Sequence, residues 1–233
     1  MELLLVLLGI FVGVVSGFFG IGGGTLSIPI LLYMGFDIKA AIGISVMQML
    51  FGSLAAFLIH RKQQTYCISD VKYFGFGGLA GAVVGGYLVK ILHPSWLEWL
   101  FLGLVVFALV KLFMSNPVPD KEEIVNRPLY VGIGSGVGIF SGMLGVGGSI
   151  LMTPILVSFL GFSLKKASAI GLFFVIFSSA SSFVTLTFLG FIDFYSASLM
   201  TFGSLFGIGI GIWILNHTKS THYKHCLLYT SPS

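Results

Sequence analysis

Long apolar stretches dominate this chain, and they limit what it can fold into more than any other feature. Only 20 of its 233 residues are charged, 12 Lys and Arg together with 8 Asp and Glu, whereas 56% are hydrophobic. A soluble domain carries about 25% charged residues. This chain lacks the side chains for such a water-facing surface. The stretches therefore predict an all-α integral membrane protein and argue against a soluble enzyme, a secreted domain or a nucleic-acid binder.

A membrane-crossing helix needs about 20 apolar residues, and the sequence contains a series of runs near or above this length. The runs are Leu3–Met34, Ala41–Ile59, Val71–Val89, Trp96–Val110, Leu129–Leu160, Ala167–Phe191 and Phe194–Leu215. The first and fifth runs have 32 residues each, which would give straight helices of about 48 Å. A glycine cluster interrupts both, so each run is expected to break into two shorter helices.

The two long runs match one another at a constant spacing of 125 residues. Ser16–Leu31 reads SGFFGIGGGTLSIPIL, and Ser141–Leu156 reads SGMLGVGGSILMTPIL. The match continues downstream, with small gaps, through the pairs Gly35 and Gly161, Lys39 and Lys165, Gly43 and Gly171, Asp70 and Asp193, Gly78 and Gly203, Gly86 and Gly211. The sequence therefore predicts a tandem duplication, a common feature of secondary transporters.

The duplicated motif S-G-x-x-G-x-G-G-[GS]-x-x-x-x-P is followed each time by a G-F-x-[IL]-K turn. This pattern resembles the TauE/SafE family of membrane transporters, and the resemblance covers Gly13 to about Leu215. It implies a multi-pass protein of the cytoplasmic membrane that exports small sulfur-containing or carboxylated anions, such as sulfite or organosulfonates.

The repeat divides the chain into a first transmembrane repeat at 1–113, a linker at 114–128 and a second repeat at 129–225. Trp96–Val110 has no counterpart in the second repeat, although members of the family that the chain resembles generally have one. The last helix of the second repeat is therefore expected to be missing. Residues 226–233 look like one translated frame of a transposon end used in sequencing libraries, which predicts a non-native tail. A genuine short tail is the alternative.

The 12 cations distinguish two ways of threading the chain. If each long run crosses the membrane once, six cations lie on either side. If each run enters as far as its glycine cluster and returns, Lys39 and Lys90 lie on one side and the other ten lie opposite. Cytoplasmic loops carry an excess of Lys and Arg, so the asymmetry favours re-entrant helix pairs. Each half then has an odd number of crossings, and the two halves are inverted relative to each other.

The glycine clusters are the candidate substrate site. A helix that restarts after each cluster has unpaired N–H groups and a positive dipole end, both suited to an anion. Glycine permits close approach, and nearby hydroxyls add hydrogen bonds. The middle of every apolar run lacks Lys and Arg, so dipoles and hydroxyls must hold the anion. The predicted binding residues are Gly22, Gly23, Gly24, Thr25, Ser27, Gly147, Gly148, Ser149, Thr153 and Gln48. The alternative is that these glycines merely permit tight helix packing.

Other polar residues have more than one interpretation. Gln48, the amide deep in a run, either lines the path or bonds to a neighbouring helix. Ser178 and Ser181 belong to a hydroxyl-rich segment that favours helix packing, and a position facing the cavity is the alternative for either. Asp70 and Asp193 stand at equivalent helix starts, where N-capping is the expected role. If transport is coupled to protons, these aspartates and His60 or His93 are the titratable candidates.

The sequence thus predicts a transporter that holds a small anion between paired half-helix N-termini, with the lipid bilayer as its surroundings. It predicts no catalytic residues, no metal site, no cofactor and no nucleic-acid partner. A passive anion channel is the alternative, since the same dipoles would serve a pore. Gly132–Gly136 weakly resembles the serine motif of an intramembrane hydrolase, but a buried partner histidine is missing.

Overall fold

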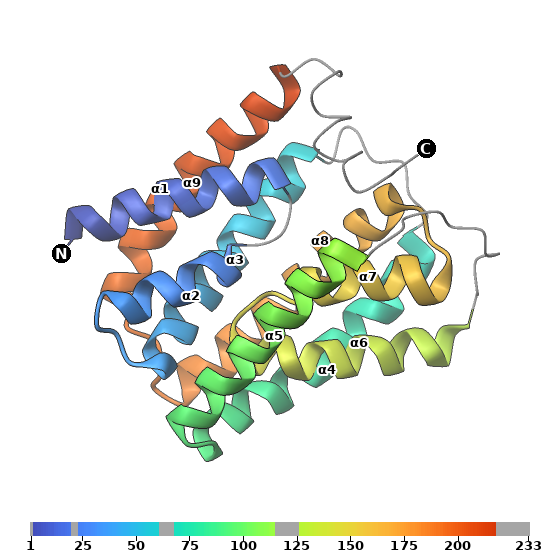
Figure 1. Ribbon diagram of the computed structural model, residues 1–233, viewed down its shortest axis with the longest axis horizontal. Helices are drawn as coiled ribbons and strands as arrows, with labels where there is room; N and C mark the ends of the chain where they lie inside the picture. Colours follow the sequence, from blue (N-terminus) through green and yellow to red (C-terminus); the bar gives the residue numbers. More distant parts are fainter. Residues whose placement is uncertain (1, 20–22, 61–67, 115–125, 218–233) are drawn as a thin grey trace.

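The computed structural model describes residues 2–19, 23–60, 68–114 and 126–217. Helices joined by short turns make up these ranges (Figure 1). The helices are α1 (Glu2–Phe19), α2 (Gly24–Tyr33), α3 (Ile38–His60), α4 (Ile68–Ile91), α5 (Pro94–Met114), α6 (Arg127–Leu144), α7 (Ser149–Leu160), α8 (Leu164–Phe188) and α9 (Phe194–His217). Most of the predicted linker and the whole predicted tail lie outside the described residues.

Within the described ranges, four helices are long and apolar enough to cross a membrane. Within α3, α4, α8 and α9, the spans are Ile38–Ile59, Lys72–Ile91, Lys166–Phe188 and Phe194–Leu215. Their bounds lie close to those of four predicted runs. The prediction of an integral membrane protein built from helices is confirmed.

Both long runs are split as the glycine clusters predict, and in each the second helix runs back along the first (Figure 1). In the first run, Val12 of α1 contacts Gly23, next to the start of α2. A groove between α1 and α2 is lined by Leu4 near the start of α1 and by Tyr33 at the end of α2. The two helices are therefore antiparallel.

The second run folds in the same way. Tyr130, near the start of α6, lies 6.1 Å from Phe162, which follows the end of α7, measured between ring centroids. Tyr130 also stacks on Phe74 of α4, with 4.4 Å between their centroids. Figure 1 shows α1 and α6 running in opposite directions. The two broken pairs thus start from opposite ends of the helix assembly.

Two pairs of helices are packed through rows of glycine at every fourth position. The rows are Gly9, Gly13 and Gly17 of α1 against Gly203, Gly207 and Gly211 of α9, and Gly77, Gly81 and Gly85 of α4 against Gly134, Gly138 and Gly142 of α6. At each of these positions an added Cβ would collide with a backbone carbonyl oxygen of the partner helix. Such approach allows Cα–H···O contacts and close van der Waals packing between membrane helices. The first helix of each half therefore packs against the fourth helix of the other half.

These contacts correct the alignment of the repeats at α4 and α9. Gly77 meets the carbonyl of Val131, and Gly203 meets the carbonyl of Val6. Because Val6 and Val131 are 125 residues apart, the equivalent of Gly203 is Gly77, at a spacing of 126 residues. The predicted pair Gly78 and Gly203 is therefore wrong by one residue, as is Gly86 and Gly211. Gly78 instead faces the Phe174 ring of α8.

Neighbouring glycines on α9 give a matched test of this packing. We expect Gly207→Ala to lower the free energy of unfolding by about 1–3 kcal/mol, since its methyl group would be forced into the Ile10 carbonyl of α1. Gly209→Ala has no described atom within 4 Å of its new methyl group, so it should raise stability by about 0.5–1 kcal/mol. Thermal unfolding of both variants in the same detergent checks this. Equal melting temperatures of the two variants would contradict the close packing of α9 on α1 at Gly207.

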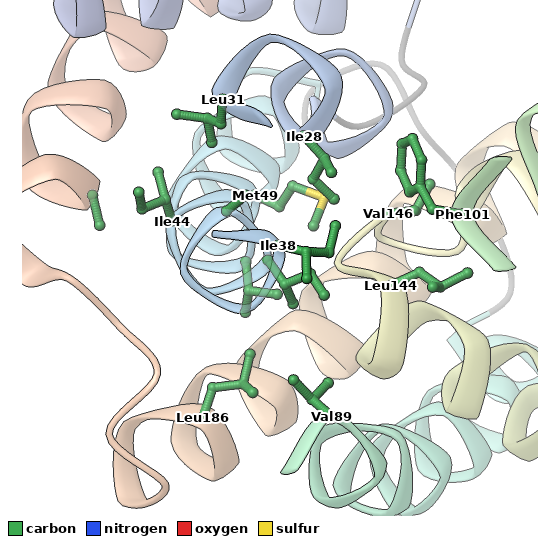
Figure 2. Packing of buried hydrophobic residues seen from close by; sticks show 14 of the residues in the cluster. Ile28, Leu31, Ile38, Ile44, Met49, Val89, Phe101, Leu144, Val146 and Leu186 are labelled. Carbon is green, nitrogen blue, oxygen red and sulfur yellow. The ribbon is translucent and has the colours of Figure 1, made fainter. Parts of the chain in front are cut away.

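The central helix is α3, which packs against α2, α8 and α9. Its residues Ala41, Ile42, Ile44 and Val46 are at most 1% exposed. Figure 2 shows side chains of this core converging from several helices, with Ile28 of α2 and Val146 of the second glycine break among them. The two broken segments therefore meet one another around α3.

Candidate functional site

The two glycine breaks are in direct contact, as the duplicated motif predicts. An added Cβ at Gly24, the first residue of α2, would collide with the carbonyl oxygen of Gly145, in the second break. The Ser45 hydroxyl of α3 donates to the same carbonyl at 2.9 Å. The start of α2 and the break before α7 therefore share one location on α3.

Glycine is required in the second break because of its backbone conformation. Gly145, Gly147 and Gly148 have φ angles of 61°, 76° and 70°, in the left-handed region that other residues rarely adopt. Gly145 ends α6 and its N–H donates to the Ser141 carbonyl at 2.9 Å. In the first break, Gly23 has an ordinary helical φ of −67°. Gly22 lies outside the described residues.

Both restarted helices begin directly after a glycine and without a side-chain cap. α2 begins at Gly24 after Gly23, and α7 begins at Ser149 after Gly148, so neither preceding residue has a side chain that can cap the helix. The carbonyl of Gly148 accepts from the N–H groups of Leu151 and Met152, at 3.1 and 2.8 Å. The carbonyl of Gly23 accepts in the same way from Leu26 and Ser27, at 3.2 and 3.1 Å.

The first break carries the buried hydroxyl of Thr25. The Thr25 Oγ1 atom is buried and has no hydrogen-bond partner among the described residues. Buried polar atoms are nearly always paired in folded proteins. An unpaired donor one residue into α2 is therefore available to a bound molecule.

Gln48 joins the first break to α9. Its side chain is 1% exposed, and an added Cβ at Gly23 would lie 2.6 Å from its Nε2 atom. Nε2 donates to the Ser204 hydroxyl of α9 at 2.8 Å. The Ser27 hydroxyl lies 3.5 Å from Gln48 Oε1, while donating to the Gly23 carbonyl at 2.7 Å. Gln48 therefore bonds to a neighbouring helix and also borders the glycine break.

Hydroxyl groups lie close to the second break. An added Cβ at Gly148 would lie 3.1 Å from the Ser141 Cβ and 2.6 Å from the Phe174 ring. The Ser141 and Ser178 hydroxyls are 3.3 Å apart, which brings Ser178 close to this break. Ser149 and Thr153 of α7 flank Gly171 of α8, within 3.7 Å of a Cβ added there.

Three other predicted candidates, Asp193, Ser181 and His93, make structural contacts. The Asp193 carboxylate caps α9, accepting from the Tyr195 N–H at 3.1 Å and the Ser196 hydroxyl at 2.6 Å. Asp70 lies two residues inside α4 rather than at its start, so the expected cap position is wrong there. Ser181 donates to the Leu79 carbonyl of α4 at 2.8 Å, which ties two helices together. His93 is exposed and accepts from the Ser95 N–H at 3.4 Å.

The side chains of Asp70 and His60 lie outside the described part of the structure. Among the residues that are described, no group of three His, Cys, Asp or Glu side chains is arranged to hold a metal ion.

Sequence reasoning did not single out Met49. This residue of α3 is 2% exposed, and its sulfur lies 2.7 Å from a Cβ added at Gly24 and 2.8 Å from one added at Gly147. It therefore contacts both breaks. An apolar residue in an apolar helix gives no signal of this kind in the sequence.

Comparison with known proteins agrees with the architecture. The sequence matches the profile of the family described as "Sulfite exporter TauE/SafE" over residues 5–230. It is 25% identical to "Probable membrane transporter protein YunE" of Bacillus subtilis, over 89% of this chain and 86% of the relative. It is 27% identical to a "Probable membrane transporter protein" of Haemophilus influenzae, over 82% and 76% of the two chains. No solved structure matches the chain.

The family profile covers nearly the whole chain and describes transporters, not enzymes. The hydrolase alternative is thereby set aside. The chain belongs to the sulfite exporter TauE/SafE family of multi-pass membrane transporters.

Proposed function

We propose that this protein is a secondary transporter that binds one small anion where its two glycine breaks meet. The observation that carries the proposal is the contact between Gly24, at the start of α2, and Gly145, in the break before α7. Two uncapped helix N-termini then lie near one location. Helix N-termini attract anions through their N–H groups and their positive dipole ends.

The chemistry of the surroundings supports an anion bound without a fixed cation. The described Lys and Arg side chains lie near helix ends, at Lys39, Lys72, Lys90, Arg127 and Lys166. The Thr25 Oγ1 atom is buried and has no hydrogen-bond partner among the described residues. Sulfite, an organosulfonate or a related small carboxylate has the negative oxygens that such donors require, and the family description supports export of sulfite.

We propose further that each broken helix pair enters the membrane and returns on the same side, so that the two halves are inverted. The antiparallel packing of α1 on α2 supports this, as does the contact between Tyr130 and Phe162. The cations support it as well. Arg127 lies over the ring of Tyr73, with 5.5 Å to its centroid, and Lys166 lies over Phe162 at 4.6 Å. Tyr73 is followed by Phe74, and both Phe74 and Phe162 pack on Tyr130. Arg127 and Lys166 therefore lie at the same end of the helix assembly.

Lys72 lies on the same end as Arg127, because it is also over the Tyr73 ring, at 5.5 Å from its centroid. The opposite end carries Lys39 and Lys90. The Lys39 ammonium donates to the Lys90 carbonyl at 3.4 Å and lies 5.4 Å from the Phe191 ring centroid. Excess cations mark the cytoplasmic side, which assigns Arg127 and Lys166 to the cytoplasm and Lys39 to the outside.

Single cysteines test this topology. We expect Arg127→Cys and Lys166→Cys to react with an impermeant maleimide only in inside-out vesicles, and Lys39→Cys only in intact cells. Cys67 and Cys226 are replaced by serine in the background. A chain that crosses once through α6 and α7 would put positions 127 and 166 on opposite sides, and labelling from opposite sides would contradict the proposal.

Anion flux into proteoliposomes tests the function. The purified chain should move labelled sulfite, short alkanesulfonates or small carboxylates faster than protein-free vesicles do, and a proton or ion gradient should drive accumulation above equilibrium. Simple dissipation of an anion gradient would instead identify a passive channel. Absence of flux for every anion in the panel would contradict both.

A further inference from the structure

Met49 occupies the space between the two halves of the proposed anion site. Its sulfur is in contact with Gly24 on one side and with Gly147 on the other. Figure 2 shows the side chain reaching from α3 toward Ile28 of α2, with Val146 of the second break on the same side of the helix. Ile28 and Val146 are 0% and 1% exposed. The thioether is therefore enclosed by both broken segments.

The position of Met49 on α3 places it on the face that contacts both breaks. Ile42 contacts Gly145, with its Cγ2 atom 3.1 Å from a Cβ added there. One turn later, the Ser45 hydroxyl donates to the Gly145 carbonyl. Met49 follows after one further turn, since residues four apart lie on the same face of a helix. This face offers a polar group at Ser45 and then an apolar group at Met49.

The surroundings of the Met49 sulfur are apolar on the side of the second break. Val175 of α8 lies 3.3 Å from a Cβ added at Gly147, the glycine that Met49 also contacts. The first break presents the Gln48 amide and the hydroxyls of Thr25 and Ser27. A molecule with a charged head and a short apolar tail matches this division.

We infer that Met49 is a specificity-determining residue that limits the length of the apolar tail accepted at the anion site. The inference rests on the proposed function. The anionic head is held at the helix N-termini, and the carbon tail of a small organosulfonate lies against the thioether. Methionine is unbranched and has three rotatable bonds, so it adapts to a short tail. A longer tail collides with it, because Gly24 and Gly147 confine it on both sides.

Shortening this side chain should change which substrates are accepted. In proteoliposomes, wild-type protein is compared with Met49→Leu, Met49→Val and Met49→Ala for flux of methane-, ethane-, propane- and butanesulfonate. As the side chain shortens, the ratio of butanesulfonate to methanesulfonate flux should rise, by about tenfold or more for Met49→Ala, since one methylene in an apolar pocket is worth at least about tenfold. Met49→Leu should leave the ratio near that of wild type.

Met200→Ala serves as the matched control. Met200 of α9 is buried as completely as Met49, at 0% exposure, but its backbone carbonyl lies against Gly9 of α1. Its loss should lower stability without changing the flux ratio. If Met49→Ala does not fold, the ratio of butanesulfonate to methanesulfonate flux in Met49→Val tests the inference in its place.

The possible results separate the inference from the function on which it rests. A wild-type ratio in Met49→Val and Met49→Ala, with flux still abolished by Gly24→Ala, would overturn the role of Met49 and leave the anion site standing. A raised ratio in Met200→Ala equal to that in Met49→Ala would also overturn it. If wild type moves none of the sulfonates, sulfite or carboxylates, the proposed function fails, and the inference fails with it.

Discussion

Gly24→Ala is expected to reduce anion flux by at least about 100-fold while the protein remains folded. The added methyl group would collide with the Gly145 carbonyl, so the two breaks would have to move apart. A displacement of about 1 Å in a site that depends on orientation costs about 100-fold in rate. Flux into proteoliposomes at equal protein content measures the effect, and circular dichroism with thermal unfolding verifies the fold.

Gly136→Ala is the control for this variant. Gly136 lies in α6, in the same half as Gly145, and no described atom is within 4 Å of a Cβ added there. Its flux should equal that of wild type. Wild-type flux in Gly24→Ala would mean that the approach of the breaks has no part in transport.

Gln48→Glu is expected to have a comparable effect through charge alone. The two side chains are nearly equal in size, and position 48 is 1% exposed beside Gly23. Two like charges about 4 Å apart repel by about 4 kcal/mol at an effective dielectric constant of 20. At pH 8, therefore, flux of an anion should fall by about 100-fold or more.

The pH dependence of this variant distinguishes charge from lost hydrogen bonding. Acidification protonates carboxylates, so lowering the pH should neutralise the new glutamate and restore part of the flux. Gln48→Met removes the bond to Ser204 without adding charge, and its flux should be less affected and independent of pH. Equal flux in the Glu and Met variants at pH 8 would contradict an anion at this break.

The apolar runs and the positions of the glycine clusters were sufficient to predict much of the fold. The runs that became α3, α4, α8 and α9 are uniformly apolar and of membrane-spanning length. The restarts at Gly24 and Ser149 follow from the glycine clusters before them. Both features depend on residues that are close together in the sequence, so the sequence alone predicts them.

The error in the repeat alignment arose where the sequence is degenerate. α4 contains the glycine doublets Gly77-Gly78 and Gly85-Gly86. Either member of each doublet matches a glycine of α9 equally well. Only packing distinguishes them, since Gly77 faces α6 whereas Gly78 faces Phe174 of α8.

The sequence predicted the two glycine breaks of the site, but it did not predict the α3 side chains that contact them. The glycine motif marked both breaks because close approach and left-handed backbone both demand glycine. Ser45 and Met49 carry no such signature. Their importance comes from α3 lying between segments that are about 100 residues apart in the chain, as the bond from Ser45 to Gly145 illustrates.

The central claim is that both breaks build a single anion site, and the number of anions bound per chain tests it most directly. Isothermal titration of the purified protein with the anion moved fastest in the flux panel should give one bound anion per chain. Gly24→Ala and Gly148→Ala, each in a different half, should each abolish that binding. Two anions per chain, with each variant removing only one of them, would contradict the claim.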